Sequence, residues 1–275
     1  MSRSIKEKRA DFQALHDQGC FVIPNPWDVG SAKMLASMGF KALASTSSGF
    51  AWTQGKADSH VSRDDVLAHL RAIVAATDLP VNADFEAGYA STPQGVAQSV
   101  RLAIEAGVAG LSIEDATYDE KNPVRAIDDA VSRLRAARVA IDESRSGVLL
   151  VGRAENFICN RPDLDDTIAR LKAYSNAGAD CLYAPGIRTK EEIAAVVKAV
   201  APKPVNLLIG WPSDLTVSEV AALGVRRISV GGAMARSAWG GFIKTAKLIV
   251  DEGRFDGFAG AASGNELNGL FERKS

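Results

Sequence analysis

The stretch Ala106-Gly107-Val108-Ala109-Gly110-Leu111-Ser112-Ile113 combines the end of a helical pattern, a glycine and a short apolar run. The same pattern recurs at residues 38–44, 177–183 and 223–230. Glycine after a helix readily takes the left-handed cap conformation that other residues resist. Each occurrence therefore predicts a joint at which a helix ends and a strand begins.

Four further apolar runs, at residues 20–23, 80–83, 148–151 and 204–208, raise the number of predicted strands to eight. The strands are apolar without alternation, which is typical of a parallel sheet that helices cover on both faces. Eight strand–helix units in about 230 residues predict an α/β fold of the (β/α)₈ TIM-barrel type. A doubly wound open sheet is the alternative, but no GxGxxG motif follows the first strand.

We expect one domain over residues 1–275, because no change of composition marks a linker, with a short tail at about 255–275. Apolar residues make up 47% of the chain and charged residues 24%, as in ordinary globular proteins. The net charge of −1 argues against nucleic acid or an anionic membrane as a partner. No apolar run approaches the ~20 residues of a membrane span.

The three cysteines, Cys20, Cys159 and Cys181, form no CxxC pair and indicate neither a disulfide framework nor a zinc site. The charged segment from Met1 to Phe12 has no apolar core of the kind that secretory signals contain. These features predict a cytoplasmic protein.

Acidic residues follow two neighbouring predicted strands at the edge where TIM barrels place their active sites. Asp84 and Glu86 end the strand that begins at Val81, and Glu114 ends the next strand. Carboxylate oxygens are the ligands that Mg²⁺ prefers, some of them through water. The sequence therefore predicts a magnesium site at Asp84, Glu86 and Glu114, with a solvated acidic turn as the alternative.

Groups suited to an anion stand on the same edge. Arg153, at the end of the fifth strand, carries a permanent, fork-shaped charge that suits a carboxylate or phosphonate, although an ion pair with Glu155 or Glu114 would also explain it. Ser47, Ser48 and Gly49 offer hydroxyls and backbone N–H groups to the same anion. Asn206, after the seventh strand, is a further binding candidate or a satisfied core amide.

Several of these segments, in this order, resemble the isocitrate lyase/phosphoenolpyruvate mutase superfamily over residues 21–249. The resemblance rests on residues 24–28 (Pro-Asn-Pro-Trp-Asp), 46–49 (Thr-Ser-Ser-Gly), 84–89 (Asp-Phe-Glu-Ala-Gly-Tyr), 113–115 (Ile-Glu-Asp), 152–156 (Gly-Arg-Ala-Glu-Asn) and 204–206 (Pro-Val-Asn). It implies a barrel whose last helix is exchanged between subunits, which gives homodimers and homotetramers.

The resemblance also implies a site for Mg²⁺, with Mn²⁺ as a substitute, at Asp84, and at Glu86 and Glu114 mostly through water. It implies an α-oxycarboxylate or enolpyruvate ligand. By position, Ser48 and Gly49 would hold the substrate carboxylate, Arg153 would neutralise it and Asp58 would approach from the second loop. Arg236, at the start of the last helix, is a weaker candidate for substrate binding.

One segment departs from the family pattern. Isocitrate and methylisocitrate lyases carry a KKCGH or KRCGH motif after the fourth strand, whereas residues 115–124 here contain neither cysteine nor histidine. Those two activities are therefore not expected. Tyr118 and Lys121 are the candidates in this loop for moving the proton, and Cys159 lies outside the motif.

The leading hypothesis is a Mg²⁺-dependent lyase that cleaves a C–C bond of a small 2-oxo or 2-hydroxy dicarboxylate through an enolate. The first alternatives are an oxaloacetate hydrolase or decarboxylase and a phosphonopyruvate-type mutase or hydrolase acting on a P–C bond. A barrel that binds a 2-oxo acid without catalysis is the third, because the usual acid/base of the loop is missing. In every case the expected partner is a small carboxylate.

Overall fold

Strands and helices alternate along the chain in a computed structural model that describes residues 3–272. The eight strands are short and nearly all of their residues are buried. They are β1 (Phe21–Ile23), β2 (Leu43–Ala44), β3 (Val81–Asp84), β4 (Gly110–Glu114), β5 (Leu149–Arg153), β6 (Cys181–Tyr183), β7 (Val205–Leu208) and β8 (Arg227–Ser229).

All strand pairs are parallel, in the order β1-β8-β7-β6-β5-β4-β3-β2. The remaining seam lies between β1 and β2, where the Ala44 N–H donates to the Pro24 carbonyl at 3.0 Å. This bond closes the sheet on itself, so the predicted (β/α)₈ barrel is confirmed.

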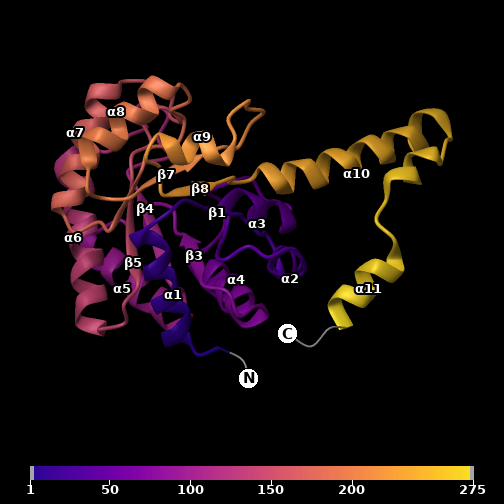
Figure 1. Cartoon of the computed structure of the whole chain (residues 1–275), viewed down its shortest axis with the longest axis horizontal. Coiled ribbons are helices and arrows are strands. Elements are labelled where there is room, and N and C mark those ends of the chain that lie inside the picture. Colours follow the sequence, from indigo (N-terminus) through magenta and orange to yellow (C-terminus); the bar gives the residue numbers. More distant parts are fainter. Residues whose placement is uncertain (1–2, 273–275) are drawn as a thin grey trace.

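Most of the helices surround the barrel (Figure 1). The helices of the described residues are α1 (Ile5–Asp17), α2 (Val29–Ser37), α3 (Ser47–Thr53), α4 (Arg63–Ala76), α5 (Pro93–Glu105), α6 (Ile127–Ser144), α7 (Leu164–Asn176), α8 (Lys190–Val200), α9 (Val217–Ala222), α10 (Ala233–Glu252) and α11 (Gly264–Glu272), with a 3₁₀ turn at Asp256–Gly260. The glycines of the recurring pattern have positive φ, for example +92° at Gly107 and +102° at Gly178. They therefore form the helix-to-strand joints that the sequence predicts.

The barrel interior is apolar at its amino-terminal end and polar at its carboxyl-terminal end. Phe12 of α1 is fully buried and packs with Phe21 and Leu149 across the amino-terminal opening. Asn82, Asn206 and Arg227 are buried in the interior above this plug. The interior is therefore closed below, and it can admit a small molecule only from above.

The last long helix departs from the barrel. In Figure 1, α10 extends away from the sheet, and the chain then returns through the 3₁₀ turn so that α11 contacts α2. Large apolar side chains of α10 remain exposed, with Phe242 64% and Val250 79% accessible. Exchange of this helix between subunits, and the single-domain organisation of the chain, stay predictions.

Candidate active site

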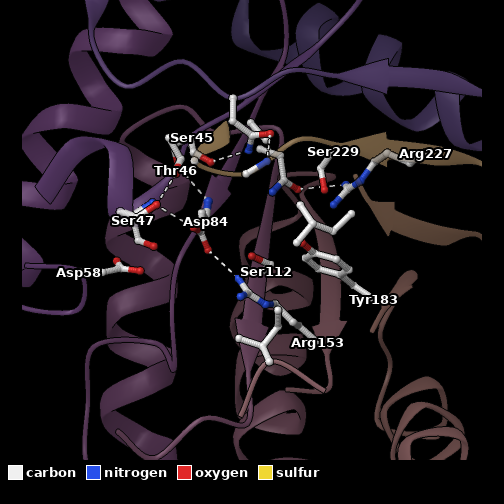
Figure 2. A pocket seen from close by; sticks show the side chains of 18 residues that line it. Ser45, Thr46, Ser47, Asp58, Asp84, Ser112, Arg153, Tyr183, Arg227 and Ser229 are labelled. Atoms are coloured by element: carbon white, nitrogen blue, oxygen red, sulfur yellow. Dashed lines mark hydrogen bonds and ion pairs between the residues drawn. The ribbon is translucent and has the colours of Figure 1, made fainter. Parts of the chain in front are cut away.

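A cavity of about 250 Å³ opens at the carboxyl-terminal ends of the strands (Figure 2). Its wall is largely polar and comes from most of the strands and the loops that follow them. The polar lining residues are Asn25, Ser45, Thr46, Ser47, Ser48, Asp58, Asn82, Asp84, Ser112, Arg153, Tyr183, Arg227 and Ser229. The edge predicted for the active site is therefore the edge that holds the cavity.

Arg153 is the centre of an ion-pair cluster in this cavity. Its Nη1 lies 3.2 Å from Asp84 Oδ1 and 2.9 Å from Glu114 Oε2, and its Nε lies 2.5 Å from Glu155 Oε1. Its guanidinium also lies over the Tyr183 ring, 5.2 Å from the centroid. Burial acts to lower the pKa of Arg153, but Glu114 and Glu155 outweigh burial and raise that pKa. The guanidinium is therefore permanently charged.

Asp84 ties this cluster to the loop after β2. Its Oδ2 accepts the Ser47 N–H at 3.0 Å, and its own N–H donates to Ser45 Oγ at 2.9 Å. Asp58 lines the same side of the cavity, where burial and the charge of Asp84 raise its pKa. Because the loop is bonded to the end of β3, the serines at the start of α3 are held beside the carboxylate.

Two glutamates lie behind the cavity wall. Glu114 is buried, and burial raises its pKa well above the ordinary value in spite of Arg153; the Tyr118 hydroxyl donates to Glu114 Oε1 at 2.8 Å. Burial raises the pKa of Glu86 to about 7. Glu86 sits in a tight turn with φ +45°. Both glutamates are therefore costly to keep charged without a further cation.

Comparison with known proteins identifies the family of this chain. The sequence profile of the phosphoenolpyruvate phosphomutase family matches residues 12–250. The chain belongs to that family. The resemblance seen in the sequence motifs is confirmed, and so is the prediction of a lyase-type enzyme.

Related proteins align with most of the length of this chain. A Burkholderia cenocepacia J2315 protein, assigned provisionally as a lyase/mutase, is 46% identical, with a TM-score of 0.96 and 99% coverage of both chains. Oxaloacetate decarboxylase of Paraburkholderia xenovorans LB400 is 27% identical over 82% of this chain and 76% of its own. The structure of an oxaloacetate acetylhydrolase with oxalate is 27% identical, with a TM-score of 0.85, over 96% and 94% of the two chains.

The donor chemistry of the phosphomutase-family site fits a divalent cation. Asp84 lines the cavity, Glu86 and Glu114 stand behind it, and all three offer the hard oxygens that Mg²⁺ takes, directly or through water. Between residues 3 and 272, no three His, Cys, Asp or Glu side chains are already gathered as a metal cluster. Of the three predicted ligands, only Asp84 faces the cavity directly.

The structure brings together some of the other predicted residues. Ser47, Ser48 and Asp58 line the cavity with Asp84 and Arg153. Gly49 is buried beside them. Its N–H donates to Thr46 Oγ1 at 3.3 Å, and a Cβ at Gly49 would lie 2.6 Å from Thr46 Cγ2. Glycine at this position therefore lets α3 pack tightly against the loop that carries the serines.

The remaining predicted residues do not line the cavity. Asn206 is fully buried beneath its wall. Lys121 is exposed in the loop after β4, and Arg236 donates from α10 to the Gly210 carbonyl. Tyr118 reaches Glu114 from a half-exposed position in that loop. Cys159 is also outside the cavity, and burial raises its thiol pKa to about 11.

The sequence did not single out Arg227 and Asn82, which also line the cavity. Both lie within strands, where a local sequence pattern does not show which side chains face the barrel interior. An arginine in a three-residue buried strand is itself a signal, because such a strand offers it no solvent. Its direction into the barrel becomes visible only once the register of β8 is known.

Proposed function

We propose that this protein is a divalent-metal-dependent lyase that cleaves a C–C bond of a small 2-oxo or 2-hydroxy dicarboxylate through an enolate. The observation that carries the proposal is the permanently charged Arg153 in a polar cavity of about 250 Å³, with Asp84 opposite it. A closed-end cavity of this size suits a molecule of a few carbon atoms. The acidic cluster around Arg153 suits a divalent cation.

In this proposal Arg153 binds one carboxylate of the substrate through its planar fork. Ser47 and Ser48, at the start of α3, flank the same carboxylate. Mg²⁺, or Mn²⁺ in its place, would be held by Asp84, with Glu86 and Glu114 through water, and would supply a Lewis acid for the developing enolate oxygen. Arrival of a substrate carboxylate at Arg153 would loosen its pairing with Asp84.

In this proposal Tyr118 transfers the proton to the enolate, and Lys121 is the second candidate in the same loop. The Tyr118 hydroxyl contacts Glu114, and burial of that end beside the carboxylate raises the tyrosine pKa. At neutral pH the phenol is therefore protonated and suits a donor to the enolate better than a base. Asp58, whose pKa is raised by burial and by the charge of Asp84, lines the cavity as a further candidate.

Two relatives bear on the substrate. An oxaloacetate decarboxylase and an oxaloacetate acetylhydrolase are both named for the same four-carbon 2-oxo dicarboxylate. At 27% identity they favour this substrate class for the present chain without fixing the bond that breaks. Oxaloacetate, malates and alkylmalates are therefore the first compounds to assay.

The test is a substrate panel with Mg²⁺, Mn²⁺ or EDTA, read by mass spectrometry of the products. We expect a C–C cleavage that EDTA abolishes and either metal restores. Asp84→Asn should remove most of the metal-dependent turnover. Turnover that persists in EDTA and in Asp84→Asn would contradict the metal assignment, and binding of 2-oxo acids without any turnover would favour a binding protein.

A second candidate is a phosphonopyruvate-type mutase or hydrolase. The family profile favours it, because that family is named for phosphoenolpyruvate phosphomutase. Arg153 and the serine hydroxyls would suit a phosphonate as well as a carboxylate. A ³¹P NMR screen with phosphonopyruvate would show release of phosphate or a rearranged P–C bond, and neither signal is expected from the lyase.

We further propose that the protein works as a homo-oligomer, formed by exchange of α10, in the cytoplasm. The exposed apolar side chains of α10 support the first part. The free cysteines Cys20, Cys159 and Cys181 fit a reducing compartment. None of the helices described within residues 3–272 has the length and apolar character needed to cross a membrane.

A further inference from the structure

Arg227 is a buried cation that no carboxylate of residues 3–272 pairs with. Its residue is 2% exposed, inside the barrel on β8. The side chains that accept hydrogen bonds from it are both neutral amides: Nε donates to Asn206 Oδ1 at 2.8 Å and Nη1 donates to Asn82 Oδ1 at 3.3 Å. Arg153, by contrast, has three carboxylates within 3.2 Å.

This arrangement satisfies hydrogen bonds but leaves a charge without a counter-charge. Burial lowers the pKa of Arg227, yet a guanidinium stays charged at any accessible pH. A buried charge is expensive unless an opposite charge lies beside it. Two of the five guanidinium N–H donors are used on the amides, so three are available to another acceptor.

The side chain is held with its free donors at the cavity. Asn206, which pairs with Arg227 in the β7–β8 register, is itself fixed by donating to Ser229 Oγ at 2.9 Å. Arg227 and Ser229 both line the cavity. Figure 2 shows Tyr183 near both arginine side chains, Arg153 on one side and Arg227 on the other. One cavity therefore contains two guanidinium groups on different strands.

We propose that Arg227 is a second anion-binding residue, which takes the far carboxylate of a dicarboxylate whose near carboxylate lies at Arg153. The inference rests on the proposed function and adds which residue binds the second carboxylate of the dicarboxylate. Asn206 is a positioning residue, because its amide oxygen directs the guanidinium without neutralising it. An arginine that served only as a distant counter-charge for the acidic cluster would not need free donors at the cavity wall.

The test compares malate with 2-hydroxybutyrate, in which a methyl group replaces the far carboxylate. Binding to the full-length protein in Mg²⁺ is measured by calorimetry. We expect the wild type to prefer malate at least tenfold. Arg227→Met should reduce that preference to about twofold or less while the affinity for 2-hydroxybutyrate changes less than threefold. Arg226→Met is the matched control, because Arg226 is only partly buried, lies outside the cavity lining and donates to the Gly19 carbonyl.

Asn206→Asp tests the same proposal without removing the arginine. The new carboxylate would pair with Arg227 in place, so the malate preference should fall as it does in Arg227→Met, while the melting temperature stays the same or rises. Equal weakening of both ligands in the two variants, or an unchanged preference, would overturn the second subsite. A wild type that binds both ligands equally would overturn it too and leave the lyase proposal standing, whereas a wild type that binds no 2-oxo or 2-hydroxy acid would overturn both.

Discussion

At the scale of single residues, the site is set by an imbalance of charge. Asp84, Glu114 and Glu155 share the single guanidinium of Arg153, and two of these acids are almost completely buried. Removing one partner of a buried ion pair leaves the other charge uncompensated, at a typical cost of about 3–5 kcal/mol. Arg153 is therefore as important for keeping the mouth of the barrel folded as for binding an anion.

The variant Arg153→Gln separates these roles. We expect kcat/KM to fall at least about a thousandfold, which corresponds to about 4 kcal/mol of lost transition-state binding. The free energy of unfolding should fall by about 3 kcal/mol at pH 8. Because the freed carboxylates can then take up protons, the stability loss should shrink as the pH is lowered towards 5. A stability loss that is the same at both pH values would contradict this account.

His16, which does not line the cavity, gives a second pH effect. Its Nδ1 lies 2.7 Å from the Phe12 carbonyl and its ring packs edge-on against Phe12 and Phe21. Burial, and then the charge of Arg227, lower the His16 pKa to about 3. Below pH 6.5 the unfolded chain binds a proton at His16 that the folded chain does not bind. The contribution of neutral, buried His16 to the free energy of unfolding is therefore present above pH 6.5 and is lost as the pH falls.

Urea unfolding of wild type and His16→Gln at pH 7 and pH 5 measures that effect. Over the 1.5 pH units below 6.5, the wild type should lose about 2 kcal/mol more than the variant, at 1.36 kcal/mol per unit. The exposed His60 is a control, and His60→Gln should behave as the wild type does. If the free energy of unfolding of His16→Gln fell as much as that of the wild type, groups other than His16 would cause the loss of stability in acid.

At the scale of elements, the loop after β4 has the greatest influence on chemistry. Its two arms are joined by the Ala116–Val124 bridge and by the Thr117 N–H, which donates to the Pro123 carbonyl at 2.9 Å. This pairing places Tyr118 over Glu114 and leaves Lys121 exposed at the far end. The loop therefore presents one of its two candidate groups to the acidic cluster.

Tyr118→Phe should lower kcat about a hundredfold, in the range of a lost general acid, while KM changes less than threefold. The melting temperature should hardly change, because the ring is retained. Lys121→Met, in the same loop, should keep kcat within a factor of three. The reverse result, with Lys121 essential and Tyr118 dispensable, would move the proton transfer to the lysine.

At the scale of the whole molecule, α10 is the helix that leaves the barrel with large apolar side chains exposed. Phe242, Ile243 and Val250 are exposed along it, and burying one such side chain contributes about 1.5–3 kcal/mol. A helix of 20 residues that stands away from its own barrel with these side chains in water suits a second copy of the chain. We therefore expect the purified protein to be larger than its 29.1 kDa monomer.

Light scattering after size exclusion checks this expectation. The wild type should elute as a dimer or tetramer, and Phe242→Asp should shift it towards monomer at micromolar concentration. Val139→Asp is the control, because Val139 is an exposed apolar residue on α6, outside the α10 surface. A monomeric wild type would refute helix exchange.

The fold could be predicted from the sequence because its signals are local. Most joints between a helix and a strand are marked by a glycine within a few residues, as at Gly107 and Gly178, and the joints before β3 and β7 are marked by a proline instead. Asp84 and Arg153 were predicted for the same reason, since a residue that follows a strand lies at a known edge. The place of Arg227 in the cavity was not predicted, because it depends on how the strands of the closed barrel are staggered. Local sequence does not contain that information.

The two arginines of the cavity also affect how the protein should be handled. Arg227, which no carboxylate of residues 3–272 pairs with, is the group in this pocket that would bind small anions, including those of the buffer. Acetate, phosphate, sulfate and citrate would compete with substrate, and assays in these salts would report a raised KM. Zwitterionic buffers without a carboxylate or phosphate group, such as HEPES, are the better choice for detecting a weak first activity.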